Sequence, residues 1–124
     1  MIYLTAPFPL SPETEELRAG TIELVREITT RDYLQRGITV FSPILYNPPL
    51  SSPSFPLWDD RWEKHNFTFL SVCTSLNILC LPYWQEDSIL QREIKKAQGW
   101  RYKIREILPD GLPGYEKILP LFPR

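Results

Sequence analysis

The sequence predicts an α/β three-layer sandwich, in which helices cover both faces of a small parallel sheet. Three short apolar segments, 2–6, 38–42 and 76–81, have the length and composition of buried strands. Segments with helical spacing alternate with them, and this alternation is typical of parallel sheets with crossover connections. If the second and third strands flank the first, the strand order is 2-1-3, which is the core of a flavodoxin-like sheet.

The first helix is expected between the first two strands, from Ser11 to Gly37. Ser11 can cap this helix, and Pro12 suits its first turn. Apolar residues then recur every three or four positions from Leu17 to Leu34, which gives the helix one buried face. Gly37 can adopt the left-handed conformation that often ends a helix.

The thirteen prolines cluster in segment 43–56 and near the C-terminus, and both regions are expected to be irregular. Segment 43–56 is longer than most connections but keeps apolar side chains, which favours an ordered flap. Segment 57–73 is predicted to be a helix with Trp58 on its apolar face. We therefore divide the chain into an α/β domain, residues 1–108, and a proline-bearing tail, residues 109–124, that packs on the body or on a neighbouring subunit.

The third strand is followed by a loop and a helix that carry most of the candidate chemistry. Either Asp87 or Ser88 can cap this helix. Its apolar residues form one stripe, and the helix is expected to continue through Ile107. Glu93 lies in the first two turns, at the edge of that stripe. A carboxylate is therefore expected close to the carboxyl end of the third strand.

Composition and charge exclude several classes of partner. The net charge is −1, and the Lys and Arg residues are scattered among acids, which argues against a nucleic-acid-binding protein. No apolar run approaches the ~20 residues of a membrane span, and the N-terminus lacks the basic region of a secretory signal. A cytoplasmic protein that binds a small molecule is therefore expected, with Cys73 and Cys80 as free thiols.

Familiar catalytic motifs are absent from the sequence, and their absence points to carboxylate chemistry. There is no CxxC, no HExxH, no glycine-rich phosphate loop and no nucleophile elbow. His65 is the only histidine, which excludes a metal site with several histidines. We expect neither a metal nor a cofactor, and we expect His65 to lie at the surface.

The expected ligand site lies at the carboxyl ends of the first and third strands, where open α/β sheets bind their ligands. The candidates come from the first strand and its turn, from the helix of segment 57–73, and from the loop and helix after the third strand. Each also has an ordinary structural role, as a packed aromatic, a turn residue, a helix cap or a solvated polar group. The candidates are Tyr3, Ala6, Pro7, Asn66, Trp84, Asp87, Ser88 and Glu93.

Three stretches of the chain read IYLTAPFP, ITVFSPI and WDDRW…FLSVCTSLNILCLPYW…DS…REIKKA, and they span about residues 1–98. They resemble the nucleoside 2-deoxyribosyltransferase-like superfamily, in particular its small branch of unknown function from phages and bacteria. The resemblance implies a flavodoxin-like fold and a homo-oligomer, because sites in this superfamily are often shared between subunits. It also implies cleavage of the N-glycosidic bond between a nucleobase and a (deoxy)ribose, by hydrolysis or by transfer to a second base.

The resemblance further implies roles for four residues. Glu93 matches the family's nucleophile, which attacks the anomeric carbon and forms a glycosyl-enzyme ester. Asp87 matches an acid that handles the base or its proton, and Tyr3 matches a tyrosine that orients the nucleophile. Ser88 matches a serine that binds phosphate at a helix N-terminus in relatives that use 5′-phosphorylated substrates. The implied partner is a nucleoside or a nucleotide, and no cofactor is needed.

The chain departs from the family pattern at several positions. Asn66 stands where the transferases carry an aspartate, Thr74 replaces a second aspartate, and no glycine precedes Glu93. An asparagine cannot be a general acid, although it can hydrogen-bond a base or a sugar. Residues 99–124 have no clear match to the segment that completes a neighbour's site in the transferases. These departures keep open an alternative, a catalytically silent nucleotide-binding or interaction domain of the same fold.

Overall fold

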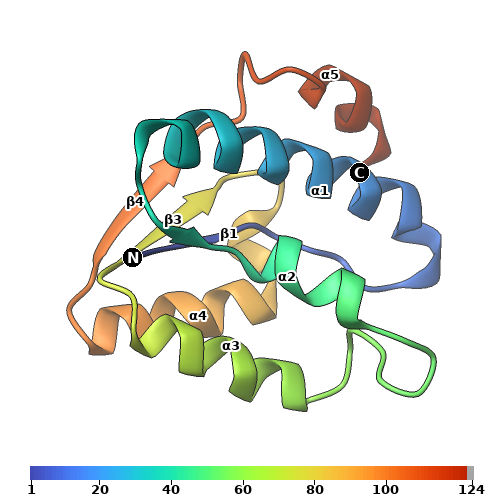
Figure 1. Cartoon of the computed structure of the whole chain (residues 1–124). Coiled ribbons are helices and arrows are strands. Elements are labelled where there is room, and N and C mark those ends of the chain that lie inside the picture. The colour runs from blue at the N-terminus through green and yellow to red at the C-terminus, as the bar shows by residue number, and fades with distance from the viewer. Residues whose placement is uncertain (123–124) are drawn as a thin grey trace.

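A four-stranded, fully parallel sheet forms the centre of the computed structural model, which describes residues 1–122 (Figure 1). The strands lie in the order β2-β1-β3-β4. The α/β fold class and the predicted 2-1-3 core are confirmed, and a fourth strand extends the sheet beyond the third. The strand bounds are Ile2–Thr5 for β1, Val40–Phe41 for β2, Ser75–Leu79 for β3 and Lys103–Ile107 for β4.

Helices cover both faces of this sheet (Figure 1). Helices α1 and α5 pack on one face, and α3 and α4 pack on the other. In the described part of the chain, no helix is both long and apolar enough to cross a bilayer. The helix bounds are Glu15–Ile28 for α1, Pro43–Leu50 for α2, Arg61–Ser71 for α3, Ser88–Gly99 for α4 and Tyr115–Ile118 for α5.

The side chains of β1 alternate between the two faces of the sheet, as the geometry of a strand requires. Leu4 packs in the apolar core beneath α1, whereas Tyr3 packs on the side of α3 and α4. Thr5 follows Tyr3 by two positions and shares its side, and both residues are almost completely buried. The α3/α4 face of β1 therefore presents two buried hydroxyl groups.

The helix predicted to continue through Ile107 ends at Gly99, so that part of the prediction is wrong. The chain reverses at Arg101, which adopts a left-handed conformation with a φ of 61°, and returns as β4 beside β3. Ile104 and Ile107 are three residues apart, a spacing that also fits a helix. Hydrogen bonding to the open edge of β3 makes the segment a strand, and this long-range contact has no local signal.

The first helical segment has the predicted extent, but it consists of several pieces. A 3-10 turn precedes α1, and a π-helical turn at Thr29–Tyr33 and a second 3-10 turn follow it. Gly37 ends the segment in the left-handed conformation with a φ of 74°, as predicted. Ser11 occupies the predicted N-cap position with Pro12 after it, but its side chain accepts no capping hydrogen bond from a backbone N–H.

Two predicted boundaries between β2 and β3 are also wrong. Segment 43–56 is predicted to be a loop, yet its first half forms α2, because Pro43 occupies the first helical position, where no N–H is needed. Helix α3 begins at Arg61. The backbone N–H of Arg61 donates a hydrogen bond to Oδ1 of Asp59 at 2.9 Å. Trp58 therefore lies in the turn before α3 and is 68% exposed, rather than on the buried face of the helix.

Cys73 and Cys80 are free thiols, as predicted. Burial raises the pKa of both groups, and it raises that of Cys80 to about 11. Because the thiolate is the reactive form of cysteine, both residues are poor nucleophiles at neutral pH. Neither thiol is therefore a candidate for the chemistry of this protein.

The tail packs on α1 through α5 and a following 3-10 turn, Leu119–Leu121. Ile118 is 5% exposed and lies directly against Gly20 of α1. A Cβ atom added at Gly20 would lie 2.1 Å from Cγ2 of Ile118, so α5 can approach α1 this closely only because Gly20 has no side chain. Residues 123 and 124 of the tail lie outside the described part of the chain.

We expect Gly20→Ala to lower the free energy of unfolding by about 1–3 kcal/mol, because the added methyl group overpacks the contact with the stiff, β-branched Ile118. Gly99→Ala is the matched control, since a Cβ atom added at Gly99 would have no heavy atom within 4 Å and alanine favours the helix. Urea unfolding of both variants and the wild type measures the difference. Equal stability of Gly20→Ala and wild type would show that α5 does not dock at Gly20.

Candidate active site

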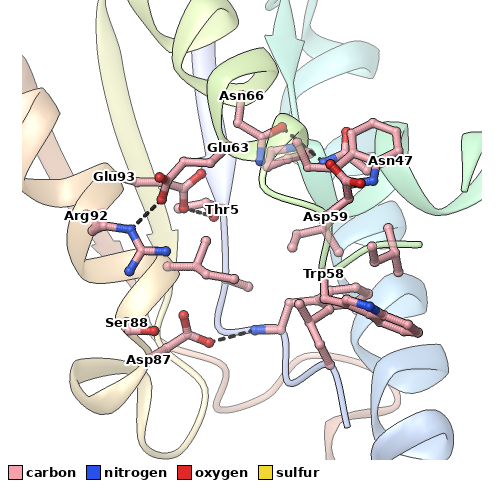
Figure 2. A pocket seen from close by; sticks show the side chains of 18 of the residues that line it. Thr5, Asn47, Trp58, Asp59, Glu63, Asn66, Asp87, Ser88, Arg92 and Glu93 are labelled. Atoms are coloured by element: carbon pink, nitrogen blue, oxygen red, sulfur yellow. Dashed lines mark hydrogen bonds and ion pairs between the residues drawn. The ribbon is translucent and has the colours of Figure 1, made fainter. Parts of the chain in front are cut away.

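A cavity of about 320 Å³ opens at the carboxyl end of β1, and it is the candidate active site (Figure 2). Its wall consists of the end of β1 with the following turn, parts of α2 and α3, the turn before α3, and the start of α4. The volume falls at the lower end of the range for small-molecule sites, roughly 300–1,000 Å³. The cavity lies at the edge of the sheet where the sequence predicts a ligand site.

Glu93 is buried in the wall of this cavity, and two hydroxyl groups from β1 hold its carboxyl group. The residue is 2% exposed and lies within the buried stripe of α4, between Leu90 and Ala97, rather than at its edge. The Tyr3 hydroxyl donates a hydrogen bond to Oε2. The Thr5 hydroxyl donates to Oε1 at 2.8 Å (Figure 2). Each carboxyl oxygen therefore has its own donor, and the group is fixed in one orientation.

Burial raises the pKa of Glu93 to about 7, although the hydrogen bonds from Tyr3 and Thr5 lower it. The neighbouring carboxyl groups of Asp87 and Glu63 raise it further. The Tyr3 hydroxyl therefore favours the ionised form of Glu93, but the loss of hydration outweighs its effect. Burial and the proximity of Glu93 raise the pKa of Tyr3 well above its usual value of 10.0, so Tyr3 remains a hydrogen-bond donor.

Asp87 begins α4 and uses both of its carboxyl oxygens to accept backbone hydrogen bonds. Oδ1 accepts from the N–H of Leu90 at 2.9 Å. Oδ2 accepts from the N–H of Phe8 at 3.1 Å (Figure 2). The first bond makes Asp87, not Ser88, the N-cap of the helix. The second bond joins the start of α4 to the turn after β1, and so fixes one side of the cavity to the other.

Three of the predicted binding residues line the cavity, and two do not. Ala6, Asn66 and Ser88 belong to its wall. Pro7 and Trp84 do not line it, so the cavity gives no support to their predicted contact with a ligand. Trp84 begins a 3-10 turn after β3 and packs with the apolar core on the α3/α4 side of the sheet.

Several residues of the cavity wall are not found by reasoning from the sequence. Thr5 has a usable signal, because it follows Tyr3 by two positions in a strand and so shares its face. Asn47 lies on α2, in the segment predicted to be a loop. Glu63 and Arg92 form an ion pair between α3 and α4, and no local spacing predicts it because 29 residues separate them (Figure 2).

Carboxyl groups dominate the charge of the cavity wall. Among the described lining residues, Arg92 is the one cation, and it is already paired with Glu63. The guanidinium of Arg61 lowers the pKa of Asp59 to about 2, so this acid is ionised at neutral pH. The wall therefore favours neutral or positively charged ligand groups over negatively charged ones. The five acids of the wall are Asp59, Asp60, Glu63, Asp87 and Glu93.

No model of a known protein family matches this chain, and no curated protein matches it. Among residues 1–122, no group of three or more His, Cys, Asp and Glu side chains is arranged to hold a metal ion. The assignment of a function therefore depends on the geometry of the cavity.

The raised pKa of Glu93 makes the stability of the protein depend on pH. An acid with a higher pKa in the folded state retains its proton after the unfolded chain has lost it. The stabilising contribution of protonated Glu93 is therefore complete below the ordinary pKa of 4.5 and is lost as the pH rises through about 7. The loss is on the order of 3 kcal/mol.

We therefore expect the free energy of unfolding of Glu93→Gln, relative to that of the wild type, to increase between pH 5 and pH 7 and to level off above pH 7. Glutamine keeps the shape of the side chain but cannot ionise, so its own stability lacks this pH dependence. Urea unfolding of both proteins across this pH range measures the difference. A difference that stays constant with pH would contradict the raised pKa.

Proposed function

We propose that this protein cleaves the N-glycosidic bond of a nucleoside, with Glu93 as the nucleophile. One observation carries this proposal: a buried carboxyl group, oriented by the hydroxyls of Tyr3 and Thr5, lies in the wall of a cavity large enough for a small molecule. Burying a carboxyl group is costly, and a purely structural role would be served better by an apolar side chain in this stripe of α4. The resemblance to the nucleoside 2-deoxyribosyltransferase-like superfamily supports the same chemistry.

The reaction would proceed in two steps through a covalent intermediate. An oxygen of ionised Glu93 attacks the anomeric carbon of the sugar while the bond from that carbon to the base nitrogen breaks. The base leaves with the bonding electron pair and takes up a proton from water. In the second step, water or a second base attacks the same carbon and gives up its proton to the hydroxide left by the first step, and the Glu93 carboxylate is released. Hydrolysis and transfer differ only in the acceptor of this second step.

The two hydroxyl groups of β1 orient the nucleophile in this mechanism. Thr5 holds one carboxyl oxygen and Tyr3 holds the other, so Glu93 is aligned before the substrate binds. Attack requires the ionised form of Glu93, whose pKa is raised to about 7. Consequently, kcat/KM should rise with pH on a limb centred near that value.

The charge of the wall favours a nucleoside over a nucleotide as the substrate. A helix N-terminus can bind phosphate, but the start of α4 is already capped by the carboxylate of Asp87. Four further carboxyl groups line the cavity, and its guanidinium, Arg92, is paired with Glu63. We therefore propose that Ser88 faces the 5′-hydroxyl of the sugar and does not bind a phosphate.

Asp87 has a positioning role in this proposal. Both of its oxygens accept backbone hydrogen bonds, an arrangement that orients α4 and with it Glu93. The resemblance implies that Asp87 handles the base or its proton. Because both oxygens of Asp87 already accept hydrogen bonds from backbone N–H groups, this residue is better suited to holding α4 in position. Water can then supply the proton to the leaving base.

Glu93→Gln should lower the rate of base release by at least ~10³-fold, because the covalent path is lost while the shape of the side chain is kept. Asp87→Asn should cost far less, since asparagine also caps a helix. Glu86→Gln is the matched control, because Glu86 is exposed and does not line the cavity. The assay follows free base by chromatography after incubation with the 2′-deoxynucleosides and their 5′-monophosphates.

Wild-type turnover that survives in Glu93→Gln would exclude Glu93 as the nucleophile. Absence of turnover with every nucleoside and nucleotide would exclude the enzyme and leave the silent nucleotide-binding or interaction domain. Faster release from the monophosphates than from the nucleosides would exclude the proposed preference for an uncharged substrate. Each result addresses a separate part of the proposal.

The cellular context belongs to the same proposal. An enzyme of this kind would act on free nucleosides in the cytoplasm, without a cofactor, and would assemble as a homo-oligomer. Self-association is expected because the superfamily that the chain resembles often shares sites between subunits. Light scattering at micromolar concentration tests this expectation, and a monomer would contradict it.

A further inference from the structure

Two asparagines in the cavity wall form a polar pair to which the proposed chemistry assigns no role. Asn47 comes from α2 and Asn66 from α3, and both line the cavity. They are 6% and 7% exposed, respectively. Figure 2 shows the pair at one end of the cavity, well apart from Asp87 and Ser88. The pair therefore faces a different part of a bound ligand from the start of α4.

The hydrogen bonds of this pair are incomplete. Nδ2 of Asn47 donates to Oδ1 of Asn66 at 3.0 Å, which leaves Nδ2 of Asn66 as the amide group available to a ligand. Oδ1 of Asn47 is buried and has no hydrogen-bond partner among the described residues. Buried polar atoms without partners are rare, because each one loses its hydration without replacement. The pair thus holds a buried acceptor without a partner, on Asn47, and a donor, on Asn66.

Aromatic side chains also line the cavity that holds this asparagine pair. Trp58, Trp62 and Phe8 line the same cavity. The Trp62 indole is fixed, because its N–H donates to the carbonyl of Pro56 at 3.0 Å and its ring stacks on Phe55. Flat apolar surfaces in the same cavity as a donor and an acceptor suit a planar heterocycle that can stack and hydrogen-bond in its own plane.

We propose that Asn47 and Asn66 together read the edge of the nucleobase, and that the ligand carries a hydrogen-bond donor next to an acceptor on that edge. The donor of the base binds Oδ1 of Asn47, and its acceptor binds Nδ2 of Asn66. This inference deepens the proposed function, since it rests on a nucleoside occupying the cavity. It assigns base selection to α2 and α3, whereas bond cleavage depends on β1 and α4.

The test measures binding to the Glu93→Gln protein by isothermal titration calorimetry, so that turnover does not interfere. The probes are the four common 2′-deoxynucleosides, each paired with a counterpart methylated to remove its edge donor: N3-methylthymidine, N4,N4-dimethyldeoxycytidine, N6,N6-dimethyldeoxyadenosine and N1-methyldeoxyguanosine. Methylation of the tightest-binding nucleoside should weaken binding at least about tenfold, because the buried Asn47 oxygen then lacks a donor. The same pair of probes should bind with equal affinity after Asn47→Leu and Asn66→Leu are added together.

The double leucine change also separates ligand recognition from a structural role. Replacing both members of a buried polar pair by apolar groups of similar size leaves stability nearly unchanged. We therefore expect thermal unfolding of Asn47→Leu/Asn66→Leu to match the wild type while discrimination between the probes is lost. Marked destabilisation of this variant would show that the pair serves the fold, and would overturn the inference.

The remaining outcomes are equally decisive. Equal binding of a nucleoside and its methylated counterpart, or discrimination that survives both leucine changes, would overturn the inference. Failure of all four nucleosides to bind at millimolar concentration would overturn it as well. Turnover without discrimination would refute this inference and leave the proposed function standing, whereas discrimination without turnover would do the reverse.

Discussion

The pairing of one buried carboxyl group with two strand hydroxyls determines the geometry of this molecule. Glu93 occupies a core position of α4, and the fold tolerates it because Tyr3 and Thr5 give each carboxyl oxygen a donor. The arrangement requires α4 to begin at a fixed place relative to β1. Asp87 provides that register by capping the helix and binding the N–H of Phe8. The cavity is therefore a direct result of how one strand and one helix are joined.

The central part of this arrangement can be predicted from the sequence because its signals are local. The strands β1 and β3 are short apolar runs, and their alternation with helical segments predicts a parallel sheet. The rule that ligands bind at the carboxyl ends of such strands then selects Tyr3 and Glu93 as candidates. This rule does not predict how deeply Glu93 is buried. Its burial depends on the position of Glu93 on α4 and on the hydrogen bond that the Thr5 hydroxyl donates to it.

The remaining features depend on contacts between distant parts of the chain. Segment 103–107 has a spacing that suits a helix, and only the open edge of β3 makes it a strand. Prolines in segment 43–56 suggest a loop, yet Pro43 begins α2 and so brings Asn47 next to Asn66. Trp58 is exposed because α3 begins only at Arg61. The helical spacing of apolar residues in the sequence does not show at which residue a helix begins.

The connection between β2 and β3 has a consequence for how the protein could change over evolutionary time. It holds α2, the turn with Trp58 and α3, and it contributes no residue to the hydrogen bonds around Glu93. β2, which precedes this connection, is only a two-residue strand at the edge of the sheet. Insertions and substitutions in residues 43–60 can therefore reshape one end of the cavity while the carboxyl group and its two donors remain in place. A lineage could diversify its ligands through this one segment and inherit the reactive centre unchanged.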